Sequence, residues 1–153
     1  MNAGPGNPLH IADGAVLSVS SEPHFHASLE RILRGSGWDV FKNHTLASSF
    51  PSLEDRTISI VICEDNLFPG TWRELLRHVL QMDDPPLLIV AARLADERLW
   101  AEALNLGAHD VLATPFDATE VIRIVGIARQ RWRNARALRC GRGEAAMAVG
   151  ATG

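Results

Sequence analysis

Two short polar clusters hold the side chains of this sequence that are best suited to chemistry. Ser20, Ser21 and Glu22 directly follow one apolar run, and Glu64 and Asp65 directly follow another. Carboxylate oxygens are the ligands that a divalent cation such as Mg²⁺ prefers, whereas hydroxyl groups beside a helix N-terminus suit a small anion. Either chemistry requires the two clusters to lie together in the folded chain.

Short apolar runs alternate with helical patterns through the middle of the chain. Most of these runs are near-continuous and rich in β-branched residues, which is typical of strands buried on both faces. The five runs are Ala15–Val19, Val40–Phe41 together with Trp38, Ile58–Cys63, Leu87–Ala92 and Val111–Ala113. Only the second run alternates apolar and polar residues, as an edge strand does.

Helix-start and helix-stop residues bracket the segments between the runs. Thr71 and Glu74 have the spacing of a capping box, ahead of an amphipathic stripe. Gly107 supplies a left-handed stop for the helix that precedes the fifth run. Pro51 interrupts the pattern of the second helix, which is therefore expected to be short, kinked or to begin at the proline.

Strands that alternate with helices imply right-handed crossovers and a parallel sheet covered on both sides. Five such units predict an α/β fold: a doubly wound, flavodoxin-like (βα)5 sheet of five parallel strands in the order 2-1-3-4-5. In this topology a crevice forms at the carboxyl ends of the strands, where strands one and three diverge. The two polar clusters, with Ala91 and Thr114 at the ends of strands four and five, are expected to surround it.

Length and composition fit one globular domain with tails. The chain has 153 residues, of which 46% are hydrophobic and 22% charged. We expect a leader over 1–13, a domain over 14–134, and a basic, then Gly/Ala-rich flexible tail over 135–153. No window approaches the ~20 apolar residues of a membrane span, and two cysteines make no disulfide framework. These features predict a cytoplasmic protein with reduced thiols and no membrane contact.

Charge is divided unevenly along the chain. Residues 1–122 carry 17 acids and 8 bases, whereas residues 123–153 carry 7 arginines and one acid, Glu144. Arg129, Arg131 and their neighbours extend the last helix as a basic arm. We expect this arm to be solvated or to dock on a partner protein, and not to contact nucleic acid, because no DNA-reading module follows it.

Four segments share the motifs of one protein family, in the same order. Residues 15–23 (AVLSVSSEP) match a first strand with its V-D-D-E-P turn, and residues 60–70 (IVICEDNLFPG) match a third strand with an acceptor aspartate ahead of Pro-Gly. Residues 103–110 (ALNLGAHD) match A-x-x-x-G-A-x-D, and residues 112–117 (LATPFD) match a K-P-F turn. Over residues 14–134 the chain thus resembles the CheY-like receiver domain of response regulators, the phosphoacceptor module of two-component signalling.

The resemblance implies a role for each crevice position. It makes Asp65 the phosphoacceptor, and it matches Ser20 and Ser21 to the acid pair that holds Mg²⁺ in this family. It matches Ala91 to the hydroxyl residue that bonds the phosphoryl group, and Thr114 to the lysine that pairs with the phosphoryl oxygens. The chain therefore keeps the acceptor and departs from the family at four other positions.

These departures predict a degenerate receiver. Phosphoryl transfer to a carboxylate brings negative charge onto negative charge, so its catalysis depends on positioned cations. Serine hydroxyls are poor Mg²⁺ ligands, and the only lysine, Lys42, lies near the second strand. We expect no enzymatic activity, no cofactor and no bound metal, and an output made by contact with protein partners, independently of phosphorylation.

Two other functions remain open. One is a working phosphoacceptor, phosphorylated at Asp65 by a histidine kinase, with Mg²⁺ held in an unusual way by Asp65, Glu22 and Glu64. The other is a flavodoxin-like module that binds a small anion or a nucleotide through the two serine hydroxyls and helix N-termini. Expected partners are a histidine kinase, an output protein, or a second copy bound through helix 4, strand 5 and helix 5, a face that includes Trp100.

Histidine and cysteine offer little further chemistry in this sequence. His24 and His26 are two residues apart on a helix and do not share a face, so we expect two solvated side chains and no metal pair. Cys63 lies in a buried strand and is expected to be a core residue, without the exposure that a redox sensor needs.

Overall fold

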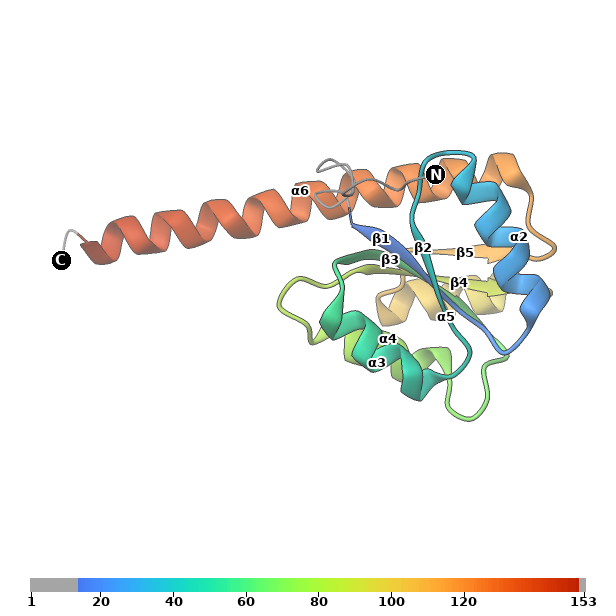
Figure 1. Cartoon of the computed structure of the whole chain (residues 1–153). Coiled ribbons are helices and arrows are strands. Elements are labelled where there is room, and N and C mark those ends of the chain that lie inside the picture. Colours follow the sequence, from blue (N-terminus) through green and yellow to red (C-terminus); the bar gives the residue numbers. More distant parts are fainter. Residues whose placement is uncertain (1–13, 152–153) are drawn as a thin grey trace.

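A five-stranded parallel sheet forms the centre of the molecule (Figure 1). The structure is a computed structural model that describes residues 14–151, with side chains described through residue 141. Its strands are β1 (Ala15–Val19), β2 (Val40–Asn43), β3 (Ile58–Glu64), β4 (Leu87–Ala92) and β5 (Asp110–Ala113). They lie in the order β2-β1-β3-β4-β5, and every neighbouring pair is parallel. The predicted fold class, the strand order and the edge position of the second strand are confirmed.

Five helices cover the two faces of this sheet. They are α2 (Pro23–Arg34), α3 (Leu46–Asp55), α4 (Trp72–Leu80), α5 (Glu97–Leu106) and α6 (Ala118–Ala151). Helices α2 and α6 pack on one face, and α3, α4 and α5 pack on the other (Figure 1). This is the two-sided covering that near-continuous apolar strands require.

Alternation along the strands decides which side chains face which helices. Val16, Ile60 and Ile62 lie in the core beneath α2 and α6, whereas Leu17 and Val61 lie in the core beneath the other three helices. Because successive side chains of a strand point to opposite faces, residues two apart share a face. Ser20 lies four positions beyond Val16, and Glu64 lies two positions beyond Ile62. Both side chains therefore point toward the face of the sheet that α2 covers.

Capping residues set the helix ends much as the sequence predicts. The Thr71 side chain accepts a hydrogen bond from the Glu74 backbone N–H at the start of α4, and Gly107 ends α5 in the left-handed region. The second helix is short, at ten residues, and contains Pro51 in its interior. It begins before this proline because Thr45 and Ser48 form a capping box ahead of it.

The last helix is longer than the sequence suggests. A flexible tail was predicted from residue 135, but α6 continues to Ala151, past the edge of the sheet (Figure 1). Alanine, the commonest residue of this stretch, favours helix. Part of the basic arm also packs on its own domain, since Trp132 is buried and Arg136 and Arg139 pair with Asp84. The predicted leader over 1–13 lies outside the described residues.

A membrane span is not found among the helices of the described region. None of them combines the length and the apolar character that crossing a bilayer needs.

Candidate functional site

The polar clusters singled out in the sequence meet at the carboxyl ends of the strands. Glu22, Glu64, Asp65 and Thr114 line adjoining hollows there, although they come from three separate strand ends, those of β1, β3 and β5. Ser20 lies fully buried behind them. Of the residues expected around the crevice, Ser20, Ser21 and Ala91 are not among those that line these hollows, and the chemical role of each residue depends on how its side chain is held.

Ser20 is held by hydrogen bonds to its own protein. Val19 pairs with Cys63 in the sheet, so the next residues, Ser20 and Glu64, lie opposite each other. The Ser20 hydroxyl donates to Oε2 of Glu64 and accepts from the backbone N–H of Glu22, at 3.0 Å. Ser21, by contrast, is exposed, and its side chain makes no hydrogen bond within the described part of the chain.

His26 extends this hydrogen-bonded chain into the core. Its Nε2 lies 2.7 Å from the Ser20 carbonyl oxygen, and its Nδ1 lies 2.8 Å from the Ser18 hydroxyl. A carbonyl can only accept, so Nε2 carries the proton and Nδ1 accepts from Ser18. Burial lowers the pKa of His26, and the bond to the Ser20 carbonyl opposes that shift.

The expectation that His26 is solvated was wrong. Only 3% of its surface is exposed, because His26, Leu29 and Leu33 occupy one face of α2 at helical spacing. That i, i+3, i+7 pattern was visible in the sequence and was the signal for burial. His24, two residues earlier, is exposed as predicted.

Asp65 lies just beyond the end of β3. Its side chain is largely exposed, and its backbone N–H donates to the Ala91 carbonyl oxygen at 2.8 Å. Partial burial raises the pKa of the Asp65 carboxyl, while backbone N–H groups of Asn66 and Asp65 act against that shift. Glu64, the last residue of the strand, is the carboxylate that Ser20 holds, and its register partner on β4 is Ala91.

The residues present do not fit the Mg²⁺ site that the resemblance implies. Two positions that would supply carboxylates carry hydroxyls, and the buried one, Ser20, already donates to Glu64. Among the residues that the structure describes, no three His, Cys, Asp or Glu side chains gather as a metal-binding group. The weak metal candidates Asp65, Glu22 and Glu64 therefore do not form such a group.

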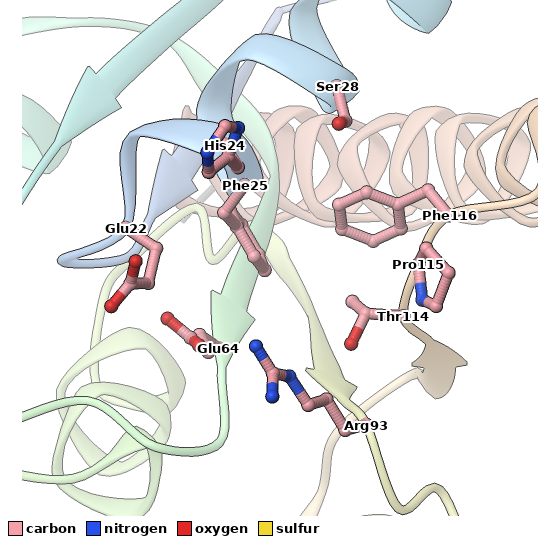
Figure 2. Close-up of a pocket in the computed structure, with 9 residues that line it drawn as sticks. All are labelled: Glu22, His24, Phe25, Ser28, Glu64, Arg93, Thr114, Pro115 and Phe116. Atoms are coloured by element: carbon pink, nitrogen blue, oxygen red, sulfur yellow. The ribbon is translucent and has the colours of Figure 1, made fainter.

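The crevice holds one cation, Arg93, at a position where the resemblance does not predict one. Thr114 is short and uncharged, and Ala91 is fully buried and has no hydroxyl. Arg93, however, follows β4 directly and reaches from there toward Glu64 (Figure 2). An arginine immediately after the buried run that ends at Ala92 was the available signal, because that position must lie at the carboxyl edge of the sheet.

A pocket of about 410 Å³ opens beside these groups. It lies between the first turns of α2 and the loop that follows β5 (Figure 2). Its lining combines charged, polar and aromatic side chains: Glu22, His24, Phe25, Ser28, Glu64, Arg93, Thr114, Pro115 and Phe116. The rings of Phe25 and Phe116 meet edge to face, with centroids 5.1 Å apart.

Comparison with known sequences points to response regulators. No family model matches the chain. The KDP operon transcriptional regulatory protein KdpE of Escherichia coli (strain K12) is 29% identical over 116 residues, which is 76% of this chain and 51% of that protein. The chain thus spans about half the length of this curated relative.

Solved structures give the same fold. A signal receiver domain of a LuxO repressor protein from Vibrio parahaemolyticus superposes with a TM-score of 0.75, at 19% identity, over 82% of this chain and 96% of that one. The beryllofluoride-activated NtrC4 receiver domain, a dimer, superposes with a TM-score of 0.72, at 18% identity, over 77% and 98%. The described residues thus have the fold of a CheY-like receiver domain, and the sequence is similar to that of response regulators.

Proposed function

We propose that this receiver domain is degenerate and signals by protein contact, independently of phosphorylation. The observation that carries the proposal is the bond from the buried Ser20 hydroxyl to Glu64. Where the family places a carboxylate to share a cation, this chain places a donor that satisfies its neighbour without one. A crevice built in this way is complete in the absence of Mg²⁺.

The charge balance of the crevice supports the same proposal. Glu22, Glu64 and Asp65 bring three carboxylates to this edge, and Arg93 brings one cation. Phosphoryl transfer to Asp65 would add negative charge beside these carboxylates, without the positioned lysine that Thr114 replaces. Removing one such positioned group commonly raises the free energy of the transition state by about 3 kcal/mol, which slows the reaction roughly a hundredfold.

The partners of such a module are proteins. We propose a histidine kinase or an output protein, or a second copy of the chain bound across α5, β5 and α6, the face that carries the half-exposed Trp100. The NtrC4 receiver is itself a dimer, which supports the last choice. We place this activity in the cytoplasm, with no enzymatic step of its own.

Phosphodonor labelling tests the proposal. The protein is incubated with Mg²⁺ and acetyl phosphate, beside a receiver that has the complete acid pair and lysine, and intact masses are recorded. We expect no stoichiometric gain of a phosphoryl group. A stoichiometric gain that Asp65→Asn abolishes would establish the working phosphoacceptor and overturn the proposal, as would a gain that survives Asp65→Asn and is lost in Glu64→Gln.

The anion-binding alternative has less support. It needs free serine hydroxyls at the edge of the crevice. The Ser20 hydroxyl already donates one hydrogen bond to Glu64 and accepts another from the Glu22 backbone. Thermal-shift titration with common nucleotides checks it, because a ligand that binds only the native state raises the melting temperature.

A further inference from the structure

We infer that the pocket between α2 and the loop after β5 binds a small zwitterion with an apolar body, of the chemical class of an α-amino acid with an apolar side chain. This inference goes beyond the proposed function and does not depend on how the domain signals. It follows from the size of the pocket, from its aromatic wall and from two unpaired charges at its mouth.

The pocket has the volume of a small-molecule site. Its 410 Å³ falls within the roughly 300–1,000 Å³ that such sites occupy. The short side chain of Thr114 leaves this space open between Glu64 on one side and the loop after β5 on the other (Figure 2). A long side chain at position 114 would reach into it.

The inner wall is apolar and well anchored. Phe25 is buried, with 7% of its surface exposed, and Phe116 packs against the same core cluster. These two rings, in edge-to-face contact, and the adjacent Pro115 line the pocket (Figure 2). An apolar side chain of a ligand would lose its contact with water against this wall, which favours binding.

The mouth presents one cation and one carboxylate that have no partner. Glu64 is engaged by Ser20, but the side chains of Arg93 and Glu22 make no hydrogen bond or ion pair within the described part of the chain. Both are exposed and line the same pocket. A ligand that brings one charge of each sign would pair with both residues.

Charge complementarity selects the zwitterion over ligands of a single sign. A carboxylate or phosphate alone would meet Arg93 but also the repulsion of Glu22 and Glu64. An amine alone would meet the carboxylates but also the repulsion of Arg93. An α-amino acid places an ammonium and a carboxylate on one carbon and directs its side chain away from both, so it can serve the charged mouth and the aromatic wall together.

Calorimetric titration of the intact chain tests the ligand class. L-Leucine and L-phenylalanine are the probes, and three compounds each lack one feature: glycine, 3-phenylpropanoate and 2-phenylethylamine. We expect the two amino acids to bind at least tenfold more tightly than any of the three. Equal binding of 3-phenylpropanoate or 2-phenylethylamine, or no binding of either amino acid at millimolar concentration, would overturn the inference.

Variants place the binding in this pocket. Arg93→Gln and Glu22→Gln each remove one charge-assisted contact and are expected to weaken binding about tenfold or more. Thr114→Lys fills the pocket and is expected to abolish binding. Arg98→Gln, which changes an exposed arginine on α5 outside the pocket, is the matched control and should bind as the unchanged chain does.

Because all four positions are exposed or half-buried, the variants should fold, and their melting temperatures verify this. Binding that persists unchanged in Arg93→Gln, Glu22→Gln and Thr114→Lys would place the ligand elsewhere and would equally overturn the inference. The phosphodonor assay measures a different property, so either proposal can fail while the other stands.

Discussion

The hydroxyl of Ser20 decides whether the neighbouring carboxylate of Glu64 needs a cation to balance its charge. Glu64 lies in the sheet beside Ser20, and an acid at position 20 would set two carboxylates against each other at the end of two adjacent strands. Such a pair needs a shared cation or a shared proton. Ser20 instead donates to Glu64, so this acid is satisfied by the protein itself. At the residue scale, the hydroxyl at position 20 therefore supplies an internal bond.

Ser20→Ala is expected to lower the free energy of unfolding by about 1–2 kcal/mol. The substitution removes the donor to Glu64 and the acceptor for the Glu22 backbone N–H, and both bonds are partly buried. Urea unfolding measures the change. Ser21→Ala is the matched control and should stay within about 0.5 kcal/mol of the unchanged protein, because its exposed side chain makes no described bond. Equal effects of the two variants would contradict the role given to Ser20.

His26 is expected to stay neutral to a lower pH than an exposed histidine. Burial is the main cause, and the nearby His44 and Lys42 also lower its pKa, while the Ser20 carbonyl and Glu30 act in the opposite direction. The His44 ring lies 4.8 Å from the His26 ring, centroid to centroid. A pH titration of the ring resonances by NMR gives the midpoint, and a value at or above 6.5 would contradict this assignment.

The same shift fixes the sign of a pH effect on stability. Below about pH 6.5 the unfolded chain takes up a proton at His26 more readily than the folded chain does. The contribution of neutral His26 to stability is therefore complete above that pH and is lost as the pH falls toward the lower folded pKa. Urea unfolding between pH 5 and 8 should show this decline, and it should be weaker in His26→Gln.

At the scale of elements, the turn after α5 depends on one glycine. Gly107 has a φ of +110°, and a Cβ there would lie 3.0 Å from Leu80 Cδ1. Gly107→Ala is therefore expected to destabilise the protein by more than about 1 kcal/mol in urea unfolding. Gly126 in α6 is the control, because a Cβ there meets nothing within 4 Å. Gly126→Ala should stabilise the protein by about 0.5–1 kcal/mol, and the same sign for both variants would contradict this account.

Most of the helices and strands could be predicted from short local patterns in the sequence. The strand runs, the cap at Thr71 and the stop at Gly107 can be recognised in short stretches of sequence, and the handedness of the crossovers then limits the possible strand orders. What stayed hidden depends on contacts between distant residues. The bond from Ser20 to Glu64 spans 44 positions, and the place of Arg93 beside Glu64 follows from the packing of different strands (Figure 2).

The length of α6 was also hidden in the sequence. Its amphipathic pattern fades after Trp132, so periodicity predicted a tail, although alanine-rich sequence favours helix without any amphipathic stripe. The role of the phosphoacceptor position Asp65 stays a prediction, because the geometry shows where this carboxylate lies and not whether it is modified.

At the scale of the whole molecule, the acidic part of the chain and the basic last helix contact each other through ion pairs. The acidic body supplies Asp84, which precedes β4, and the basic arm supplies Arg136 and Arg139 on α6. Arg129 and Arg136 also lie over the rings of Trp38 and Trp132. These contacts hold the middle of α6 to the domain before the helix continues past it (Figure 1).

Asp84→Asn is expected to loosen α6 without unfolding the domain. Exposed ion pairs contribute about 0–1 kcal/mol each, so the loss of the two pairs should lower global stability by about 2 kcal/mol at most. Local opening should change more, and backbone amides of residues 130–141 should exchange with deuterium several-fold faster, as read by mass spectrometry. High salt should reproduce the effect in the unchanged protein, because it screens exposed pairs.

Asp83→Asn gives the matched control for this experiment, because it removes the adjacent, exposed carboxylate, for which the described residues supply no partner. It should leave exchange over 130–141 unchanged. Equal acceleration by both variants would mean that net charge, and not the pairing with Asp84, holds the helix. No acceleration in Asp84→Asn would mean that α6 is anchored by its buried face, including Trp132, and not by the pairing with Asp84.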